Sequence, residues 1–314
     1  MQKEIINILV CPKCKKPLNQ DERRLVCRQC NQVYNIDKGI INFQVELLEE
    51  IKALSSEYMD MEADYYDKIH LHMSQENDLF QGIIKEVSTS GKIILDVATG
   101  TGFILDNFEA LNKEGKFLCL DISRNMLRRA IQKHGKRIAL ALRADAECIP
   151  IKDSSIDMVT ISSSLHHLPN PPKALQEIYR VLMPGGIFLI FHEPTISPSL
   201  GFLFKYFNRI CTIYNNLRPK TKEEIERKRR VKEYAKEIFG IEEEAAFQRM
   251  QDWNRRITAQ AGFNPSTLLS NQLYEILKIQ HYYSKKTMIN ELKGILFPSE
   301  GELFYIVAKK RIRK

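Results

Sequence analysis

The sequence predicts an α/β protein whose main part is a doubly wound, mostly parallel sheet, with a small metal-binding module before it and a helical insertion after it. Short apolar runs alternate with amphipathic segments between residues 91 and 191, which is typical of parallel strands covered by helices on both faces. A glycine-bearing turn at residues 98–102 follows the first run, and two Cys-x-x-Cys pairs stand near the N-terminus. These three observations define the expected organisation of the chain.

The composition is that of an ordinary globular protein. The 314 residues are 44% apolar and 27% charged, and this length suits one large domain or two modest ones. No apolar run reaches the roughly 18 residues of a membrane span, so we expect none. The apolar patch at residues 5–10 passes directly into cysteines and lysines, unlike a cleavable signal peptide. We therefore expect a cytoplasmic protein.

The positive charge is concentrated in two places. The formal net charge is +8, yet residues 218–236 alone carry nine basic and four acidic residues, and residues 309–314 carry five basic residues and no acid. The rest of the chain is therefore slightly acidic. Such segments can meet phosphate groups or an anionic membrane surface, and a simple solvated helix face is the alternative.

Four cysteines near the N-terminus predict a metal site. Cys11 and Cys14 form the first pair and Cys27 and Cys30 the second, with twelve residues between the pairs. Two such knuckles joined by a hairpin present four thiolates in a tetrahedron, which favours zinc, although iron fits the same spacing. Disulfides are the remaining alternative, and a reducing compartment disfavours them. With no open ligand position implied, we expect a structural zinc that supplies much of the folding energy of this short segment.

The N-terminal segment also resembles a known family. The stretches Ile8-Leu-Val-Cys-Pro-x-Cys14 and Tyr34-x-Ile-x-x-Gly-Ile40, with the second knuckle between them, are similar to zinc ribbons of the Trm112 type over residues 5–43. They are also similar to the zinc modules fused to some bacterial rRNA guanine methyltransferases. The resemblance implies a contact for a partner protein or for RNA at this end of the chain.

Helices and strands alternate after this module. Residues 46–73 lack Gly and Pro and have apolar positions at helical spacing, so we expect helix there, interrupted at Ser55 and Ser56. Ser123 is a plausible N-cap, and Pro184 follows a helix end. The expected strands are 92–97, 116–120, 137–143, 156–162 and 187–191, and the expected helices are 103–112, 125–134 and 172–182.

Three acids follow the first three strands, where an α/β sheet binds its ligands. Asp96 closes the first strand beside the glycines, and Asp121 closes the second, about twenty residues after the glycine turn, where a carboxylate can accept both hydroxyls of a ribose. Asp145 follows the third strand, where it could meet an adenine amine. This layout indicates a cofactor that contains adenosine. A dinucleotide is the competing ligand, but its third glycine is missing, because position 105 is Leu.

The same residues carry a resemblance to class I S-adenosylmethionine-dependent methyltransferases, in their type 11, quinone methyltransferase-like branch. It covers about residues 80–195 and departs from the usual pattern at Ala98, which replaces a glycine, and at Phe103, which replaces an acid. The matching stretches are Leu95-Asp-Val-Ala-Thr-Gly-Thr-Gly102, Leu120-Asp-Ile-Ser-x-x-Met-Leu127, Ala144-Asp-Ala-Glu-x-Ile-Pro150, Ser154-Ser-x-Asp157, Leu165-His-His-Leu-Pro169 and Glu177-x-x-Arg180-Val-Leu-x-Pro-Gly-Gly186.

The resemblance implies a Rossmann-like sheet of seven strands, S-adenosylmethionine as cofactor and a role for each motif. The turn at 98–102 would face the methionine part, Asp121 the ribose and Ile122 the adenine. Ser162 would line the methyl-transfer pocket, and Tyr65 or Tyr66 would close over the cofactor. The candidate cofactor-binding residues are Tyr66, Asp96, Ala98, Thr99, Gly100, Gly102, Asp121, Ile122, Met126, Asp145, Ala146 and Ser162.

A catalytic residue does not follow from the sequence. His166 and His167 are candidates for a general base. Methyl transfer from a sulfonium depends above all on alignment and proximity, and an acidic nucleophile needs no protein base. Whether a base is used is therefore left open, as are the oligomeric state and the acceptor atom.

The last third of the chain predicts a lid and the closing strands of the sheet. Residues 201–217 are rich in aromatic side chains and would shape an apolar pocket, touch a membrane surface or simply pack on the core. Residues 273–281 and 302–309 read as a closing antiparallel hairpin. The expected domains are a zinc ribbon at 1–45, a helical linker and cofactor cap at 46–90, the cofactor-binding core at 91–195, a helical lid insertion at 196–260 and the final strands at 261–314.

These features predict an S-adenosylmethionine-dependent methyltransferase. A small or lipid-like acceptor is favoured by the quinone-type motifs and the aromatic lid. RNA is the alternative, favoured by the zinc ribbon and the basic segments, although no Asn-Pro-Pro-Tyr-type motif for an exocyclic amine stands in the right place. A non-catalytic cofactor-binding partner protein is the third hypothesis, with the ribbon docking it to another protein.

Overall fold

The structure is a computed structural model of the whole chain. It describes residues 3–43 (except 22), 50–69 (except 65), 77–194 (except 88, 90 and 91), 274–282 and 303–312, together with positions 219, 222, 225 and 229. Apart from those four positions, the predicted lid at 196–260 lies outside these residues, as do its aromatic stretch, most of the basic segment at 218–236 and Tyr65.

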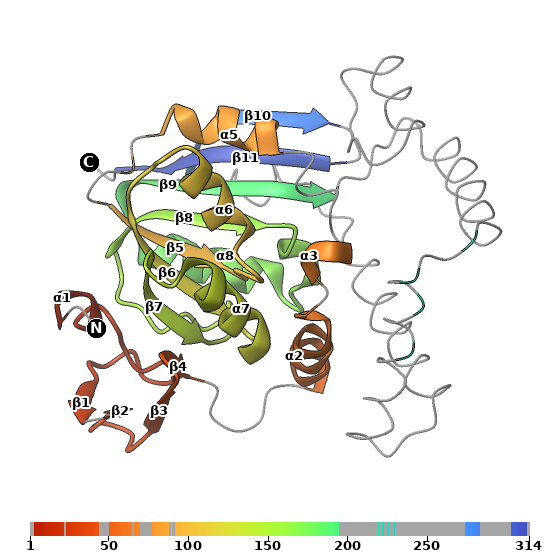
Figure 1. Cartoon of the computed structure of the whole chain (residues 1–314). Coiled ribbons are helices and arrows are strands. Elements are labelled where there is room, and N and C mark those ends of the chain that lie inside the picture. The colour runs from red at the N-terminus through yellow and green to blue at the C-terminus, as the bar shows by residue number, and fades with distance from the viewer. Residues whose placement is uncertain are drawn as a thin grey trace.

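Among the described residues, seven neighbouring strands of an eleven-stranded sheet form its main part, in the order β7-β6-β5-β8-β9-β11-β10. The first five are parallel, and β11 runs antiparallel to both β9 and β10 at the edge far from β7 (Figure 1). The predicted seven-stranded, mostly parallel sheet is therefore confirmed. The strands are β5 (Ile93–Val97), β6 (Lys116–Asp121), β7 (Ile138–Arg143), β8 (Ile156–Ser162), β9 (Leu182–Pro194), β10 (Tyr274–Tyr282) and β11 (Leu303–Lys310).

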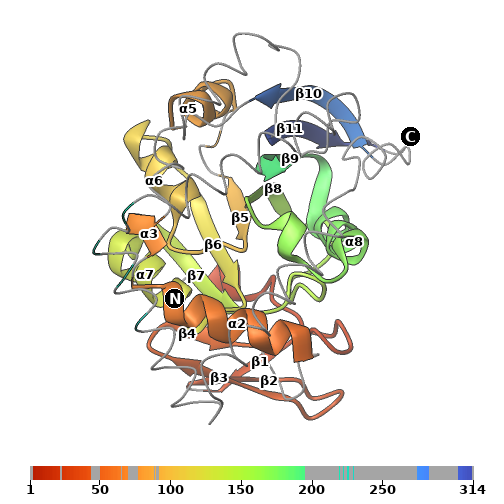
Figure 2. The same ribbon diagram turned by 90° about the vertical axis from the view of Figure 1, so that its right-hand side faces the viewer.

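Helices cover both faces of this sheet. Figure 2 shows α6 and α7 on one face and α8 on the other, which is why the central strands are apolar on both sides. Ser123 caps α7 by accepting the N–H of Met126, and Asn170 caps α8 by accepting the N–H of Lys173. The helices are α2 (Glu50–Glu62), α3 (Tyr66–Ile69), α5 (Asn77–Lys85), α6 (Phe103–Ala110), α7 (Arg124–His134) and α8 (Pro171–Val181), with a 3₁₀ turn at Leu165–His167.

The cysteine-bearing module continues the sheet. It contains α1 (Lys3–Ile6), β1 (Asn19–Asp21), β2 (Arg24–Val26), β3 (Val33–Asp37) and β4 (Ile40–Asn42). Strand β4 pairs in parallel with β7, with Ile40 opposite Ala141 and Asn42 opposite Arg143. Buried side chains of the module, among them Leu9 and Tyr34, belong to the same apolar cluster as Ile151 of the core. The module and the core therefore share one hydrophobic interior.

Two sequence-based expectations about these elements are wrong. Helix α2 runs without a break through Ser55 and Ser56, because the Ser56 hydroxyl donates to the carbonyl of Ile122 (3.0 Å) and does not compete for the backbone of its own helix. Strand β9 begins at Leu182, five residues earlier than expected, since Leu182 pairs with Ile156 before an irregular step to the next pair. Among the described helices, none is long and apolar enough to cross a membrane.

Candidate functional site

A cavity of about 240 Å³ opens at the carboxyl ends of β5, β6, β7 and β8. This is the edge of the sheet at which the sequence placed its three acids. The predicted cofactor-binding residues that line the cavity are Tyr66, Asp96, Ala98, Thr99, Gly100, Asp121, Ile122, Met126, Asp145, Ala146 and Ser162. Gly102 is the one predicted residue that is not part of the lining.

The turn after β5 is closed by hydrogen bonds to its surroundings. Thr99 donates its hydroxyl to the carbonyl of Asp96 (2.8 Å), and the Gly100 N–H donates to Asp121 Oδ2 (2.8 Å). Ala98 and Gly100 both adopt positive φ, at 53° and 57°. A Cβ on Gly100 would meet no atom within 4 Å. The turn thus presents bare backbone to the cavity, as close approach to a ligand requires.

Gly102 has a packing role. Its φ is +99°, and a Cβ there would stand 2.9 Å from Cδ2 of His134, a buried side chain on α7 that pairs with acids of α6. Glycine is therefore needed for the left-handed turn into α6 and for the approach of α7.

Replacing Gly102 with alanine is expected to destabilise the protein by about 2–3 kcal/mol, through backbone strain and the displacement of His134. The matched variant Gly100→Ala should cost about 1 kcal/mol, because only backbone strain applies there. Urea unfolding of both variants measures the difference. Equal losses would contradict a packing role for Gly102.

Asp121 is held in place by two backbone donors. Its Oδ2 accepts the N–H of Gly100 and its Oδ1 accepts the N–H of Ser123, both at 2.8 Å. Burial raises the pKa of Asp121 to about 6, and these hydrogen bonds oppose the rise. Each oxygen keeps a lone pair, so the carboxylate can accept a pair of neighbouring hydroxyls.

Asp96 Oδ2 and Ser162 Oγ are buried atoms of the cavity that have no hydrogen-bond partner in the described part of the chain. The other oxygen of Asp96 accepts the hydroxyl of Thr160 at 2.7 Å, and burial raises the pKa of this acid to about 7. Buried polar groups in native proteins nearly always have a hydrogen-bond partner, so these two atoms are suited to bind a ligand that offers hydrogen-bond donors. The ammonium and hydroxyl groups of S-adenosylmethionine fit that description.

Helix α2 adds residues that sequence reasoning missed. Lys52 is only 5% exposed, and its Nζ lies 2.8 Å from both Asp145 Oδ2 and Glu147 Oε2. Tyr58 and Glu62 line the same cavity. In this structure the predicted adenine acceptor, Asp145, is thus already paired with a cation. The helical spacing of residues 52, 55, 59 and 62 is the sequence signal that could have indicated a common face of α2.

The two histidines have different surroundings. His167 lines the cavity, whereas His166 lies beside it, with its Nδ1 2.8 Å from Oε2 of Glu193. Glu193 is fully buried at the end of β9 and also accepts the backbone N–H groups of Ser164 and Leu165. Glu193 therefore shapes the loop that carries both imidazoles, and this role was not apparent from the sequence.

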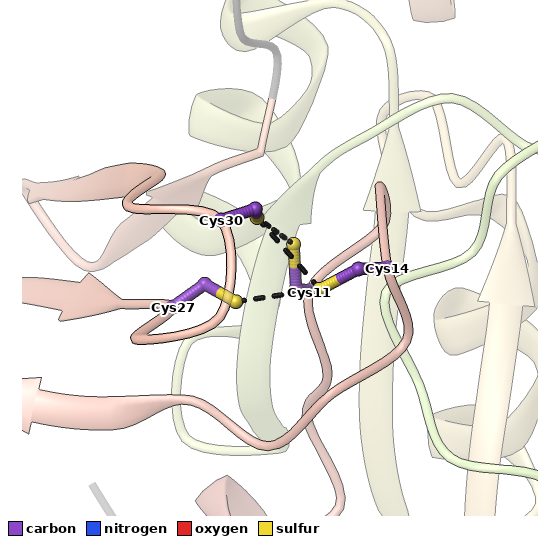
Figure 3. A group of neighbouring side chains, drawn as sticks. All are labelled: Cys11, Cys14, Cys27 and Cys30. Atoms are coloured by element: carbon purple, nitrogen blue, oxygen red, sulfur yellow. Dashed lines mark hydrogen bonds between the residues drawn. The ribbon is translucent and has the colours of Figure 1, made fainter.

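The four predicted metal ligands converge. All four sulfur atoms lie within 4.8 Å of one another, with Cys11–Cys30 at 3.5 Å, Cys14–Cys27 at 3.4 Å and Cys14–Cys30 at 3.7 Å (Figure 3). A tetrahedron with Zn–S bonds of about 2.3 Å separates its sulfurs by about 3.8 Å. The Tyr34 hydroxyl lies 3.0 Å from Cys11 Sγ and can support that ligand from outside. The cluster is consistent with a structural zinc.

Comparison with known families agrees with this geometry. A methyltransferase domain model matches residues 95–190, and a Trm112p-like protein model matches residues 2–39. Both kinds of domain are therefore present, and the core is that of an S-adenosylmethionine-dependent methyltransferase.

Individual relatives are more distant. The chain is 26% identical over 247 residues to an uncharacterized chloroplastic methyltransferase of Arabidopsis thaliana, covering 68% of this chain and 70% of that protein. It is 36% identical over 115 residues to the ubiquinone/menaquinone biosynthesis C-methyltransferase UbiE of Escherichia coli, covering 34% of this chain and 46% of the enzyme. The chain thus matches about half the length of UbiE.

One solved structure supports the fold over most of the chain. A chain of the complex between the Haloferax volcanii Trm112 methyltransferase activator and a methyltransferase superposes with a TM-score of 0.50 at 12% identity. The superposition covers 84% of this chain and 99% of that one.

Proposed function

We propose that this chain, whose core is that of an S-adenosylmethionine-dependent methyltransferase, methylates a small or lipid-like acceptor. The observation that carries the proposal is the cavity, because the candidate cofactor-binding residues line it together with a group of residues at the end of β8 and in the segment after it. That group combines small polar with apolar side chains: Ser162, Ser163, Ser164, His167, Leu168 and Pro169. The match to UbiE, whose name specifies a quinone-pathway C-methyltransferase, supports an acceptor of this class.

The proposed mechanism rests on positioning. S-adenosylmethionine supplies an electrophilic methyl group on a sulfonium. Asp121 would hold the ribose hydroxyls, and Asp96 would accept the ammonium group. Ser162 and His167 line the same cavity and would contact the acceptor. Fixing the two reactants in line provides most of the acceleration, because displacement at a sulfonium needs little other assistance.

A fractionated methyl-transfer assay tests the acceptor class. Purified, metal-replete protein and labelled S-adenosylmethionine are added to a cell extract that has been divided into RNA, protein, and small-molecule plus lipid fractions. We expect label in the last fraction. Label confined to RNA or to protein would contradict the proposed acceptor.

RNA is the second candidate, and the Trm112p-like domain together with the basic segments at 218–236 and 309–314 favours it. Binding through these cations should weaken steeply with salt. Failure to bind bulk RNA at low salt would eliminate this candidate. Turnover of any acceptor would likewise eliminate the third hypothesis, a non-catalytic partner protein. For location we propose the cytoplasm, where a four-thiolate site stays reduced.

The affinity for S-adenosylmethionine is expected to rise between about pH 6 and pH 8. Burial raises the pKa of Asp96 to about 7, so below that pH the acid must lose its proton before it can pair with the cationic ligand. The rise should approach tenfold per pH unit below the pKa and then level off. The free energy of unfolding of the unliganded protein should change in the opposite direction. It should fall from about pH 4 to pH 7, because burial disfavours the ionised carboxylate of Asp96. Calorimetry across this range measures the affinity, and Asp96→Asn should remove most of its pH dependence above about pH 6, the pKa of Asp121.

A further inference from the structure

We infer that Lys15, in the first cysteine knuckle, is a positioning residue for the cofactor cavity. It acts on the loop that follows β7, residues 144–151, which carries Asp145 and Ala146 into the cavity wall. The inference rests on the proposed function, because it assumes that this cavity holds S-adenosylmethionine.

The knuckle and this loop lie side by side. The Val10 N–H donates to the carbonyl of Pro150 (3.0 Å), and the Lys152 N–H donates to the carbonyl of Ile8 (2.8 Å). The thiol of Cys148, which lies outside the four-cysteine cluster, donates to the carbonyl of Pro12 (3.1 Å). The outer side of the loop is therefore attached to the segment that holds the first two metal ligands.

Lys15 makes the charged contact of this interface. Its Nζ donates to Glu177 Oε2 at 2.8 Å and to the carbonyl of Ile149 at 3.2 Å. Its own backbone N–H donates to the carbonyl of Cys11 (2.8 Å), which closes the turn between the two ligands of the knuckle. The side chain is 34% exposed, so solvent screens the ion pair in part.

Helix α8 also forms hydrogen bonds with the loop at residues 144–151, through Arg180. Arg180 donates to the carbonyls of Ile149 and Ile151, at 2.9 and 2.6 Å, and pairs with Glu177. Lys15 and Arg180 thus converge on one carbonyl, Ile149 O, with the Glu177 carboxylate between them. This accounts for the Glu177-x-x-Arg180 motif, to which the sequence assigned no task.

The inner side of the loop is tied to the lining of the cavity. Asp145 Oδ1 accepts the N–H of Glu147, and both acids bind Lys52 of α2. The loop is therefore clamped between the cysteine knuckle outside and the cofactor cavity inside. Removing the Lys15 ammonium deletes its hydrogen bonds to Glu177 and to the carbonyl of Ile149. The loop then becomes more mobile, and ordering it when the cofactor binds costs free energy.

Lys15→Met tests the inference, with Lys16→Met as the matched control, because Lys16 is exposed and its side chain forms no hydrogen bond or ion pair with the described part of the chain. The metal-replete full-length proteins are titrated with S-adenosylhomocysteine by calorimetry. We expect Lys15→Met to weaken binding about three- to tenfold, as the loss of one partly screened charged hydrogen bond implies. Lys16→Met should stay within about twofold of the wild type, and Lys15→Arg should restore most of the affinity.

Hydrogen exchange separates positioning from general destabilisation. In Lys15→Met, exchange should accelerate at residues 144–152, while the unfolding midpoint and the bound metal stay unchanged. Unaltered affinity in Lys15→Met, or accelerated exchange across the whole sheet, would overturn the inference. Failure of the wild type to bind S-adenosylhomocysteine would instead refute the proposed cofactor, and the inference with it.

Discussion

Replacing Cys27 with serine is expected to destabilise the whole chain, with a loss of at least about 3 kcal/mol and a fall of roughly 6–12 °C in the unfolding midpoint. Cys27 is one of four sulfurs within 4.8 Å of one another, and loss of a thiolate forfeits much of the metal's contribution to folding. The effect should reach the core, because β4 pairs with β7 and both regions share one apolar cluster. Scanning calorimetry should therefore record a single transition at lower temperature, with loss of the bound metal.

Cys148→Ser provides the matched control for this experiment. Cys148 is half-buried, lies outside the cluster, and donates to a carbonyl, which a serine hydroxyl can also do. It should retain the metal and lose less than about 1 kcal/mol. A Cys27→Ser protein whose core melts at the wild-type temperature would contradict the structural coupling between the two domains.

Replacing Asp121 with alanine is expected to weaken the binding of S-adenosylmethionine about 100-fold. Two hydrogen bonds from ribose hydroxyls to a carboxylate are worth about 1.5–3 kcal/mol each, and the loss of both is offset only in part by water. The substitution also leaves the Gly100 N–H without its acceptor and loosens the turn after β5. Calorimetric titration of the variant measures the loss.

Asp157→Ala is the control for Asp121→Ala. Asp157 also accepts a backbone N–H, that of Ile93 (2.8 Å), but it lies at the opposite end of β5 and does not line the cavity. It should lower stability by about 1 kcal/mol and leave the affinity unchanged. If Asp157→Ala weakened binding as much as Asp121→Ala, the effect would arise from the sheet and not from a ribose contact.

Local sequence patterns predicted most of the core. The strand and helix assignments between residues 92 and 182 depend on alternating apolar runs and on caps such as Ser123, and both signals are local. The carboxyl ends of parallel strands meet at one edge, so strand order was not needed to bring Asp96, Asp121 and Asp145 to one cavity.

Contacts between distant segments could not be predicted in this way. The parallel pairing of β4 with β7 joins residues about a hundred positions apart, and a three-residue apolar strand does not specify its partner. Lys52 reaches Asp145 from a largely polar helix whose apolar pattern is weak. The role of Glu193 could not be predicted for the same reason. The four groups that donate hydrogen bonds to its carboxylate belong to a loop 27 to 29 residues earlier in the chain.

The backbone conformation of the turn after β5 could also be predicted only in part from the sequence. The resemblance to methyltransferases indicates that Ala98 replaces a glycine. The structure shows that Ala98 adopts a φ of 53°, a conformation that glycine adopts more easily. An alanine in this region is strained by about 1 kcal/mol, and its neighbours must hold it there. Such strain is typical of sites that bind a ligand through exposed backbone.

The most direct test of the central claim is a calorimetric titration of wild-type, metal-replete protein with S-adenosylmethionine. The account predicts binding at one site per chain, with an affinity that increases from pH 6 toward pH 8. Absence of binding at millimolar concentrations, or an affinity that does not depend on Asp121, would contradict the assignment of this cavity to the cofactor.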